Sequence, residues 1–154
     1  MNFDRLETLY HQPLFDLMSQ SRAAHLEHWR GEEVQRCSLL SIKTGGCSED
    51  CAYCAQSAHY PTGLERENLL PVDENMTAAK RARAQGATRL CMGAAWRGVR
   101  EGRPKFEQVI DAIRTVRQLG TEVCVTVGQV RPHEARRTKE EGVTFRVPPN
   151  MGFD

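Results

Sequence analysis

The sequence lacks long hydrophobic runs: its apolar stretches are a few residues long, far short of the roughly 20 residues that a transmembrane helix needs. It also lacks an excess of either charge, since 21 Lys and Arg stand against 20 Asp and Glu, and it has no basic tail. Its first residues show neither the basic nor the apolar region of a signal peptide. We therefore expect a cytoplasmic protein with no membrane and no nucleic-acid partner.

The composition that is present fits a globular chain. The 154 residues are 40% apolar and 27% charged, which favours one folded domain over a disordered chain. Low-complexity tracts are absent. The six cysteines are expected to be metal ligands, reactive thiols or core residues, because disulfides are rare in a reducing compartment.

Helical and strand-like segments follow one another in a regular order. Apolar positions at helical spacing predict two short helices within residues 2–30, interrupted at Pro13. Farther along, three predicted helices each end at a glycine that leads into a strand, which is typical of repeated βα units. We expect strands at 34–43, 88–93, 122–128 and 143–147, and helices at 73–85, 104–119 and 132–141.

These units predict an α/β fold. Consecutive parallel strands joined by helices indicate a partial (β/α) TIM-type barrel of about three and a half βα units, preceded by N-terminal helices. The corresponding division of the chain is an N-terminal helical segment at 1–33, the partial barrel at 34–147 and an irregular C-terminal end at 148–154.

Alternation along two predicted strands places two cysteines on the same kind of face. The valines of 122–128 share the face that should meet helices, which leaves Cys124 on the opposite face. In the second strand Cys91 likewise shares the opposite face with Arg89 and Gly93. In a closed barrel this face is the interior, where neighbouring strands bring both sulfurs together. The alternative is that both cysteines are small buried fillers.

Cys47, Cys51 and Cys54 form a C-x3-C-x2-C run on a glycine-containing loop directly after the first predicted strand. Thiolates suit iron–sulfur clusters or zinc. Three local sulfurs would leave one iron of a cubane cluster open, whereas a zinc ion would need a fourth ligand, which His59 could supply. The position at the carboxyl end of a strand, where βα barrels place active sites, favours the cluster.

This cysteine run is the radical S-adenosylmethionine signature, and the segments around it resemble the biotin synthase family. The matching segments are Ser38–Gly45, Ala55–Ser57, Tyr60–Leu64, Arg89–Trp96 and Glu122–Gly128. The resemblance runs from about Leu14 to Gly142, and several motifs in one order make it more specific than the cysteine run alone.

The resemblance implies sulfur insertion that converts dethiobiotin to biotin, with hydrogen atoms removed from two unactivated carbons. It implies that Cys47, Cys51 and Cys54 hold a [4Fe-4S] cluster whose free iron is chelated by S-adenosylmethionine. Reductive cleavage of that cofactor would give the 5′-deoxyadenosyl radical. An electron-donor protein such as flavodoxin or ferredoxin, and a homodimer, are implied in the same way.

The resemblance also assigns cofactor contacts. Tyr53 is expected near the adenine, and Gly93, Ala94 and Ala95 are expected to hold the methionine moiety through backbone groups. The alternatives are simple packing for Tyr53 and a tight turn at Gly93.

A second, deeper [2Fe-2S] cluster is implied as the sulfur donor, with Cys91 and Cys124 as two of its ligands. The family's third cysteine, its arginine ligand and its Asn-rich motif have no counterpart among these residues. We therefore expect a truncated or degenerate copy in which this ligand set is incomplete. Cys37 matches no family ligand and is expected to be a buried thiol.

Three hypotheses for the function follow. The first is a radical S-adenosylmethionine sulfurtransferase of the biotin synthase family. The second is a non-catalytic fragment that binds an iron–sulfur cluster and S-adenosylmethionine. The third is a small zinc-binding domain.

Overall fold

The structure is a computed structural model that describes residues 2–29 and 33–146. The irregular end expected at 148–154 lies outside the described residues. Internal contacts divide the chain into two units, Met1–Val34 and Gln35–Asp154. Within the described ranges, no helix is both long enough and apolar enough to cross a membrane.

The first unit contains two helices. α1 (Phe3–Tyr10) begins after Asn2, whose side chain accepts a hydrogen bond from the Arg5 N–H at 3.1 Å. α2 (Leu14–His28) begins directly after Pro13, which has no N–H and cannot continue the preceding helix. The two helices predicted on either side of this proline are confirmed. Neither helix contains a buried residue.

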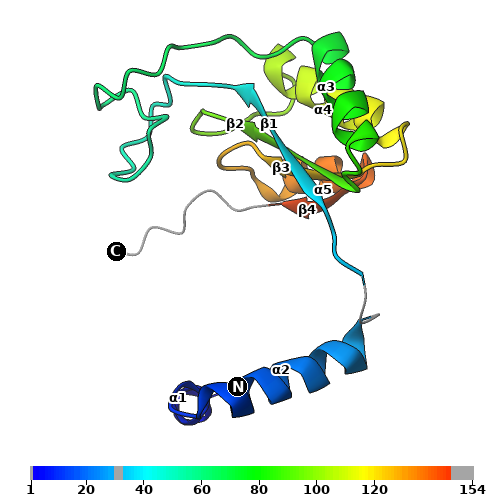
Figure 1. Ribbon diagram of the computed structural model, residues 1–154. Helices are drawn as coiled ribbons and strands as arrows, with labels where there is room; N and C mark the ends of the chain where they lie inside the picture. The colour runs from blue at the N-terminus through cyan, green and yellow to red at the C-terminus, as the bar shows by residue number, and fades with distance from the viewer. Residues whose placement is uncertain (1, 30–32, 147–154) are drawn as a thin grey trace. The chain divides into compact units, whose positions relative to one another are not determined.

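The second unit alternates strands and helices: β1 (Cys37–Lys43), α3 (Val72–Ala84), β2 (Arg89–Ala94), α4 (Pro104–Arg117), β3 (Glu122–Thr126), α5 (Pro132–Glu140) and β4 (Val143–Arg146). The strands form one parallel sheet in the order β1-β2-β3-β4 (Figure 1). Sequential parallel neighbours are what repeated βα units produce, because each helix returns the chain to the start of the next strand. The predicted α/β fold class is confirmed.

The core lies between the sheet and its helices, as the alternation predicted. Val123, Val125 and Val127 are each 0% exposed, and they belong to one cluster with Phe106 and Ile110 of α4. Burying a side chain of this size stabilises the fold by roughly 1.5–3 kcal/mol. The helix-facing side of the sheet is therefore the structural side, which leaves the other face and the strand ends for chemistry.

Two strand boundaries differ from the prediction by more than one residue. β1 begins at Cys37 rather than Val34, because its first partner on β2 is Arg89 and the ladder does not extend further back. β3 ends at Thr126 rather than Gly128, because its last partner is Gly93. In both cases the neighbouring strand, and not the composition of the segment, sets the end.

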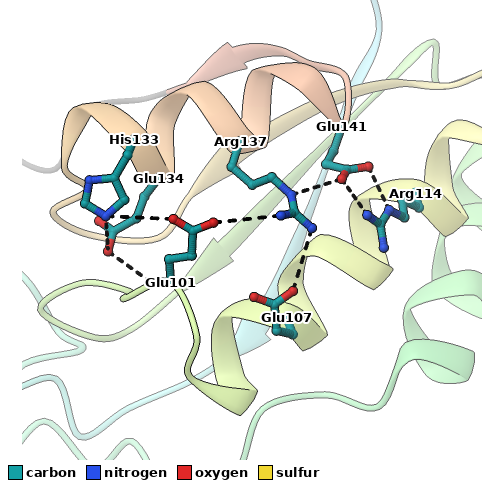
Figure 2. A network of polar contacts seen from close by, with 7 residues as sticks. All are labelled: Glu101, Glu107, Arg114, His133, Glu134, Arg137 and Glu141. Carbon is teal, nitrogen blue, oxygen red and sulfur yellow. Dashed lines mark hydrogen bonds and ion pairs between the residues drawn. The ribbon is translucent and has the colours of Figure 1, made fainter.

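A charged network joins α5 to α4 and to the loop before α4 (Figure 2). Arg137 lies 3.8 Å from Glu101, 3.9 Å from Glu107 and 3.1 Å from Glu141. Arg114 of α4 lies 2.5 Å from Glu141, which directly follows α5, and this pair adds to the link that Arg137 and Glu107 make between the two helices. A single exposed ion pair contributes little to the stability of the fold, but several charges in one network contribute more and connect the neighbouring helices.

Glu134 is the buried member of this network, with a side chain that is 0% exposed. Its carboxylate accepts hydrogen bonds from the backbone N–H of Arg131 at 2.7 Å and of Glu101 at 3.1 Å. Burial alone would raise the pKa of Glu134, but the two backbone hydrogen bonds and the nearby charges of Arg100 and His133 together outweigh burial, and the pKa is lowered. The buried carboxylate thus holds the loop that follows β2 against the start of α5.

Candidate functional site

The loop that carries the cysteine run leaves the carboxyl end of β1 through two glycines. Gly45 and Gly46 have φ values of 65° and 64°, in the left-handed region that other residues rarely adopt. A Cβ atom on Gly45 would also lie 2.5 Å from the carbonyl oxygen of Glu65. The chain can therefore make this turn, and approach its own later segment so closely, only with glycine at position 45.

Backbone hydrogen bonds close the loop around its first cysteine. The Cys47 N–H donates to the Gln56 carbonyl at 2.9 Å, and the Ala58 N–H donates to the Cys47 carbonyl at 2.8 Å. The Gln56 side-chain oxygen accepts a hydrogen bond from the Gly45 N–H at 2.6 Å. The segment entering the loop and the segment leaving it are thereby held side by side.

Ser57 makes further hydrogen bonds within the loop and is buried, with 5% of its surface exposed. Its hydroxyl donates to the Glu49 carbonyl at 2.8 Å and accepts from the His59 N–H at 3.2 Å. One small side chain thus joins two parts of the loop. The sequence resemblance included Ser57 within a motif but did not indicate this structural role.

The three cysteines of the run line one cavity of about 620 Å³. Cys47, Cys51 and Cys54 are all partly buried, and the Cys54 N–H donates to the Cys51 carbonyl at 2.9 Å, so the loop turns between these two sulfurs. Tyr53 lines the same cavity, although its side chain is 76% exposed. It is not packed in the core.

The carboxyl end of β2 forms the facing wall of this cavity. Gly93, Ala94 and Ala95 all line it, and the Ala95 N–H donates to the Lys43 carbonyl at 2.8 Å. Gly93 lies inside β2, so the alternative that it makes a tight turn is wrong. A Cβ atom there would meet no other atom within 4 Å, which shows that the space above the strand is open.

Several cavity residues were missed by the sequence analysis: Ser41, Lys43, Gln56, Trp96, Arg97, Thr126, Gly128 and Gln129. Lys43 is buried, and its ammonium donates to the Gly45 carbonyl at the start of the loop. Burial, followed by the nearby charge of Arg66, lowers the pKa of Lys43. Alternation along β1 could not have placed this lysine, because the register shifts between Ser41 and Lys43, and Lys43 pairs with Ala94.

Residues from two loops close the far end of the cavity. The Trp96 ring nitrogen donates to the Val127 carbonyl at 3.0 Å, and the Gln129 N–H donates to the Arg97 carbonyl at 2.7 Å. Arg97 also lies 3.5 Å from Glu49 on the cysteine loop. These contacts link the loops after β1, β2 and β3, a relation that spacing along the chain does not show.

The two deeper cysteines are directly paired on neighbouring strands. Cys91 of β2 stands opposite Cys124 of β3, and Cys124 is 1% exposed. Burial, and then a hydrogen bond between the two side chains, raises the pKa of Cys91. The structure therefore brings this predicted pair together on the face opposite the helices.

Polar residues occupy the adjoining row of the same face. Arg89 and Glu122 form an ion pair at 2.8 Å, and Glu122 also accepts hydrogen bonds from Gln35 and Thr144. The hydrogen bond from Arg89, followed by that from Thr144, lowers the pKa of Glu122 to about 2. Arg89 thus shares the face of Cys91, as predicted, and its guanidinium is paired with a carboxylate.

Cys37 is exposed, so its prediction as a buried thiol is wrong. It begins β1, which is an edge strand in the described part of the sheet, and its parity turns it away from the helices that form the core. Burial requires a neighbour on that side, and the sequence could not show whether one is present.

His59, the candidate fourth ligand for zinc, has its ring nitrogen Nε2 at 3.1 Å from the Ser48 carbonyl. Over residues 2–29 and 33–146, no three His, Cys, Asp or Glu side chains lie close enough together to hold a single metal ion. The three thiols of the loop thus share a cavity without converging on one point.

Comparisons with known proteins agree with this arrangement. The chain is 48% identical to biotin synthase of Azoarcus sp. (strain BH72) over 140 residues, which is 91% of this chain and 42% of that protein. It is 50% identical to biotin synthase of Ruegeria pomeroyi, covering 92% and 44%, and 52% identical to that of Sorangium cellulosum, covering 88% and 38%. The predicted resemblance is confirmed, and the chain spans about two fifths of the length of these curated relatives.

A structural comparison supports the fold. The chain matches the crystal structure of methylornithine synthase (PylB) with a TM-score of 0.66, over 94% of this chain and 42% of that one. The two sequences are 16% identical, so this likeness concerns the fold alone. No family model matches the chain.

Proposed function

We propose that this chain forms the cluster- and cofactor-binding part of a radical S-adenosylmethionine enzyme of the biotin synthase type. The observation that supports this most is the shared cavity, which is lined by Cys47, Cys51 and Cys54 on one side and by the end of β2 on the other. The identity of about 50% to biotin synthases supports the same assignment.

The donor set fits a [4Fe-4S] cluster. Cys47, Cys51 and Cys54 would each bind a different iron, so their sulfurs need not converge on one ion. A cluster with three protein ligands keeps one iron open toward the cavity. When bound, the cluster and S-adenosylmethionine would supply the one-electron chemistry that opens an unactivated C–H bond.

The remaining walls suit the cofactor. Gly93, Ala94 and Ala95 would hold the methionine moiety through backbone carbonyls, each of which has a second lone pair beside the strand hydrogen bonds, and no side chain covers the strand at Gly93. The exposed ring of Tyr53 is free to contact a flat adenine. The buried ammonium of Lys43 fixes the turn that begins the cysteine loop through the Gly45 carbonyl.

The substrate and the second cluster belong to the same proposal. Dethiobiotin would be the substrate, converted to biotin with sulfur from a [2Fe-2S] cluster on Cys91 and Cys124. Both thiols lie on the face opposite the helices, on strands that also line the cavity. An electron-donor protein such as flavodoxin or ferredoxin would supply the electron from outside.

Anaerobic reconstitution of the chain with iron and sulfide tests the first site. We expect a visible iron–sulfur spectrum with about four irons per chain at this site. The irons and the spectral contribution of this site should be lost when Cys47, Cys51 and Cys54 are replaced by serine and kept in the control Cys124→Ser. Adding S-adenosylmethionine should change the electron paramagnetic resonance spectrum of the reduced cluster, because the cofactor would bind its open iron.

The outcomes separate the three hypotheses. A cluster that responds to S-adenosylmethionine and supports formation of biotin from dethiobiotin would establish the enzyme. A cluster with the same response but no turnover would favour a non-catalytic binding fragment. One colourless zinc ion per chain, removed by the same cysteine substitutions, would overturn the proposal.

A further inference from the structure

A third thiol lies on the face that carries Cys91 and Cys124. Strand pairing places Cys37 beside Arg89, and it places Leu39 beside Cys91. Cys37 is therefore the diagonal neighbour of Cys91, two residues earlier on the adjacent strand, and both residues have the same parity. Neighbouring strands lie about 4.8 Å apart and rise about 3.3 Å per residue, so the Cα atoms of these diagonal neighbours are separated by about 8 Å, a gap that a cluster between the two sulfurs could bridge.

The surroundings of Cys37 leave its sulfur available. It is exposed, it lies outside the cysteine loop, and the biotin synthase resemblance gives it no role. Its neighbour in register, Arg89, is turned to Glu122 on the far side at 2.8 Å. The positive charge of Arg89 remains close enough to offset some of the negative charge that thiolate ligands would bring.

The arrangement matches the ligand geometry of a dinuclear cluster. The two irons of a [2Fe-2S] cluster take two ligands each. Cys91 and Cys124 stand directly opposite each other, so their thiolates can share one iron. The Cys37 thiolate lies farther along the same face, on the diagonal from Cys91. It could therefore bind the second iron of a cluster whose first iron is held by Cys91 and Cys124.

We propose that Cys37 is a third thiolate ligand of the deep site, binding the second iron of a cluster that Cys91 and Cys124 hold through the first. This rests on the proposed function, because it takes the deep site to be a [2Fe-2S] site. The described part of this chain then contributes three of the four ligands.

The test uses the full chain with Cys47, Cys51 and Cys54 replaced by serine, so that only the deep site can assemble. Iron and sulfide are added anaerobically with a small thiol to fill the fourth position. Two irons and two sulfides per chain are expected after desalting, with the spectrum of a [2Fe-2S] cluster.

Cys37→Ser in this background should reduce the retained iron at least tenfold, since even the loss of a group that supports a metal ligand costs about 10–100-fold in affinity. The matched control adds Ser38→Cys to Cys37→Ser, which moves the thiol by one residue to the helix-facing side. It should not restore the cluster. Restoration by that control, or equal iron with and without Cys37, would overturn the proposal.

A measurement on the unsubstituted chain keeps the test independent of variant folding. Alkylation of Cys37 should be fast in the apo chain and slow after reconstitution, whereas Cys124 is buried and should react slowly in both states. Fast alkylation of Cys37 in chains that show the [2Fe-2S] spectrum would also overturn the proposal. Failure of the loop site to assemble would instead count against the proposed function, so the two failures are distinguishable.

Discussion

Replacing Glu134 should remove a large part of the stability of the second unit. The side chain is 0% exposed and accepts hydrogen bonds from two backbone N–H groups, those of Arg131 and Glu101. Glu134→Ala leaves both donors without their acceptor. A hydrogen bond to a charged group contributes about 1.5–3 kcal/mol, so the loss of both should lower the free energy of unfolding by about 3–6 kcal/mol. A domain of this size has only about 5–15 kcal/mol in total.

Two further variants separate the hydrogen bonds from other effects of the substitution. Glu134→Gln keeps one acceptor oxygen and should lose less, about 2 kcal/mol. Glu140→Ala, on the exposed side of the same helix, should change stability by less than about 0.5 kcal/mol. Urea unfolding followed by circular dichroism, under reducing conditions, measures all three. A Glu134→Ala midpoint equal to that of Glu140→Ala would refute the reasoning.

The pH dependence gives an independent check of the same interaction. Because the pKa of Glu134 is lowered in the folded chain, its stabilising contribution is present above the ordinary carboxyl pKa of about 4.3. The contribution is lost as the pH falls through the folded pKa. The difference in stability between the unsubstituted chain and Glu134→Gln should therefore shrink below about pH 4. A constant difference from pH 7 to pH 3 would contradict it.

Three other predictions concern the site and its support. Gly128→Ala should destabilise far more than Gly102→Ala in urea unfolding, because both have positive φ but only at Gly128 would a Cβ atom lie 2.5 Å from the Arg97 carbonyl oxygen; equal losses would show that this close approach is unimportant. Ser57→Ala should speed iron release from the reconstituted loop, whereas Ser57→Thr keeps the hydroxyl and should slow it again. Glu122→Gln should flatten the loss of stability between about pH 5 and pH 2, because the lowered pKa of Glu122 makes its contribution disappear as pH falls through that range; an unchanged acid profile would argue against it.

Strand faces could be predicted because a strand has a strict period of two. The buried valines of β3 fixed the parity of the whole strand, and Cys124 followed from it. The pairing of Cys124 with Cys91 needed one further assumption, that consecutive βα units lie side by side, and the sheet order agrees with it. Local pattern and connection rules were sufficient for this part of the site.

The exposure of Cys37, and the loop contacts that bring Trp96 and Arg97 to the cavity, could not be predicted in the same way. Whether Cys37 is covered depends on what stands beside an edge strand, which its own segment does not encode. Trp96 and Arg97 reach the cavity because their loop bonds to the loop after β3, at Val127 and Gln129. Such contacts depend on sheet register and loop geometry, and no periodicity marks them.

Strand β2 connects the two candidate sites, and this has a physical consequence. Cys91 faces away from the helices, and Gly93 follows it on the same face at the cavity, about 7 Å along the strand. Since side chains alternate, a shift of β2 by one residue would turn both positions to the opposite face together. The buried Leu90 and Met92 oppose such a shift, because it would move them out of the core. The helix-facing side of β2 therefore holds both sites in register, although neither Leu90 nor Met92 lines the cavity.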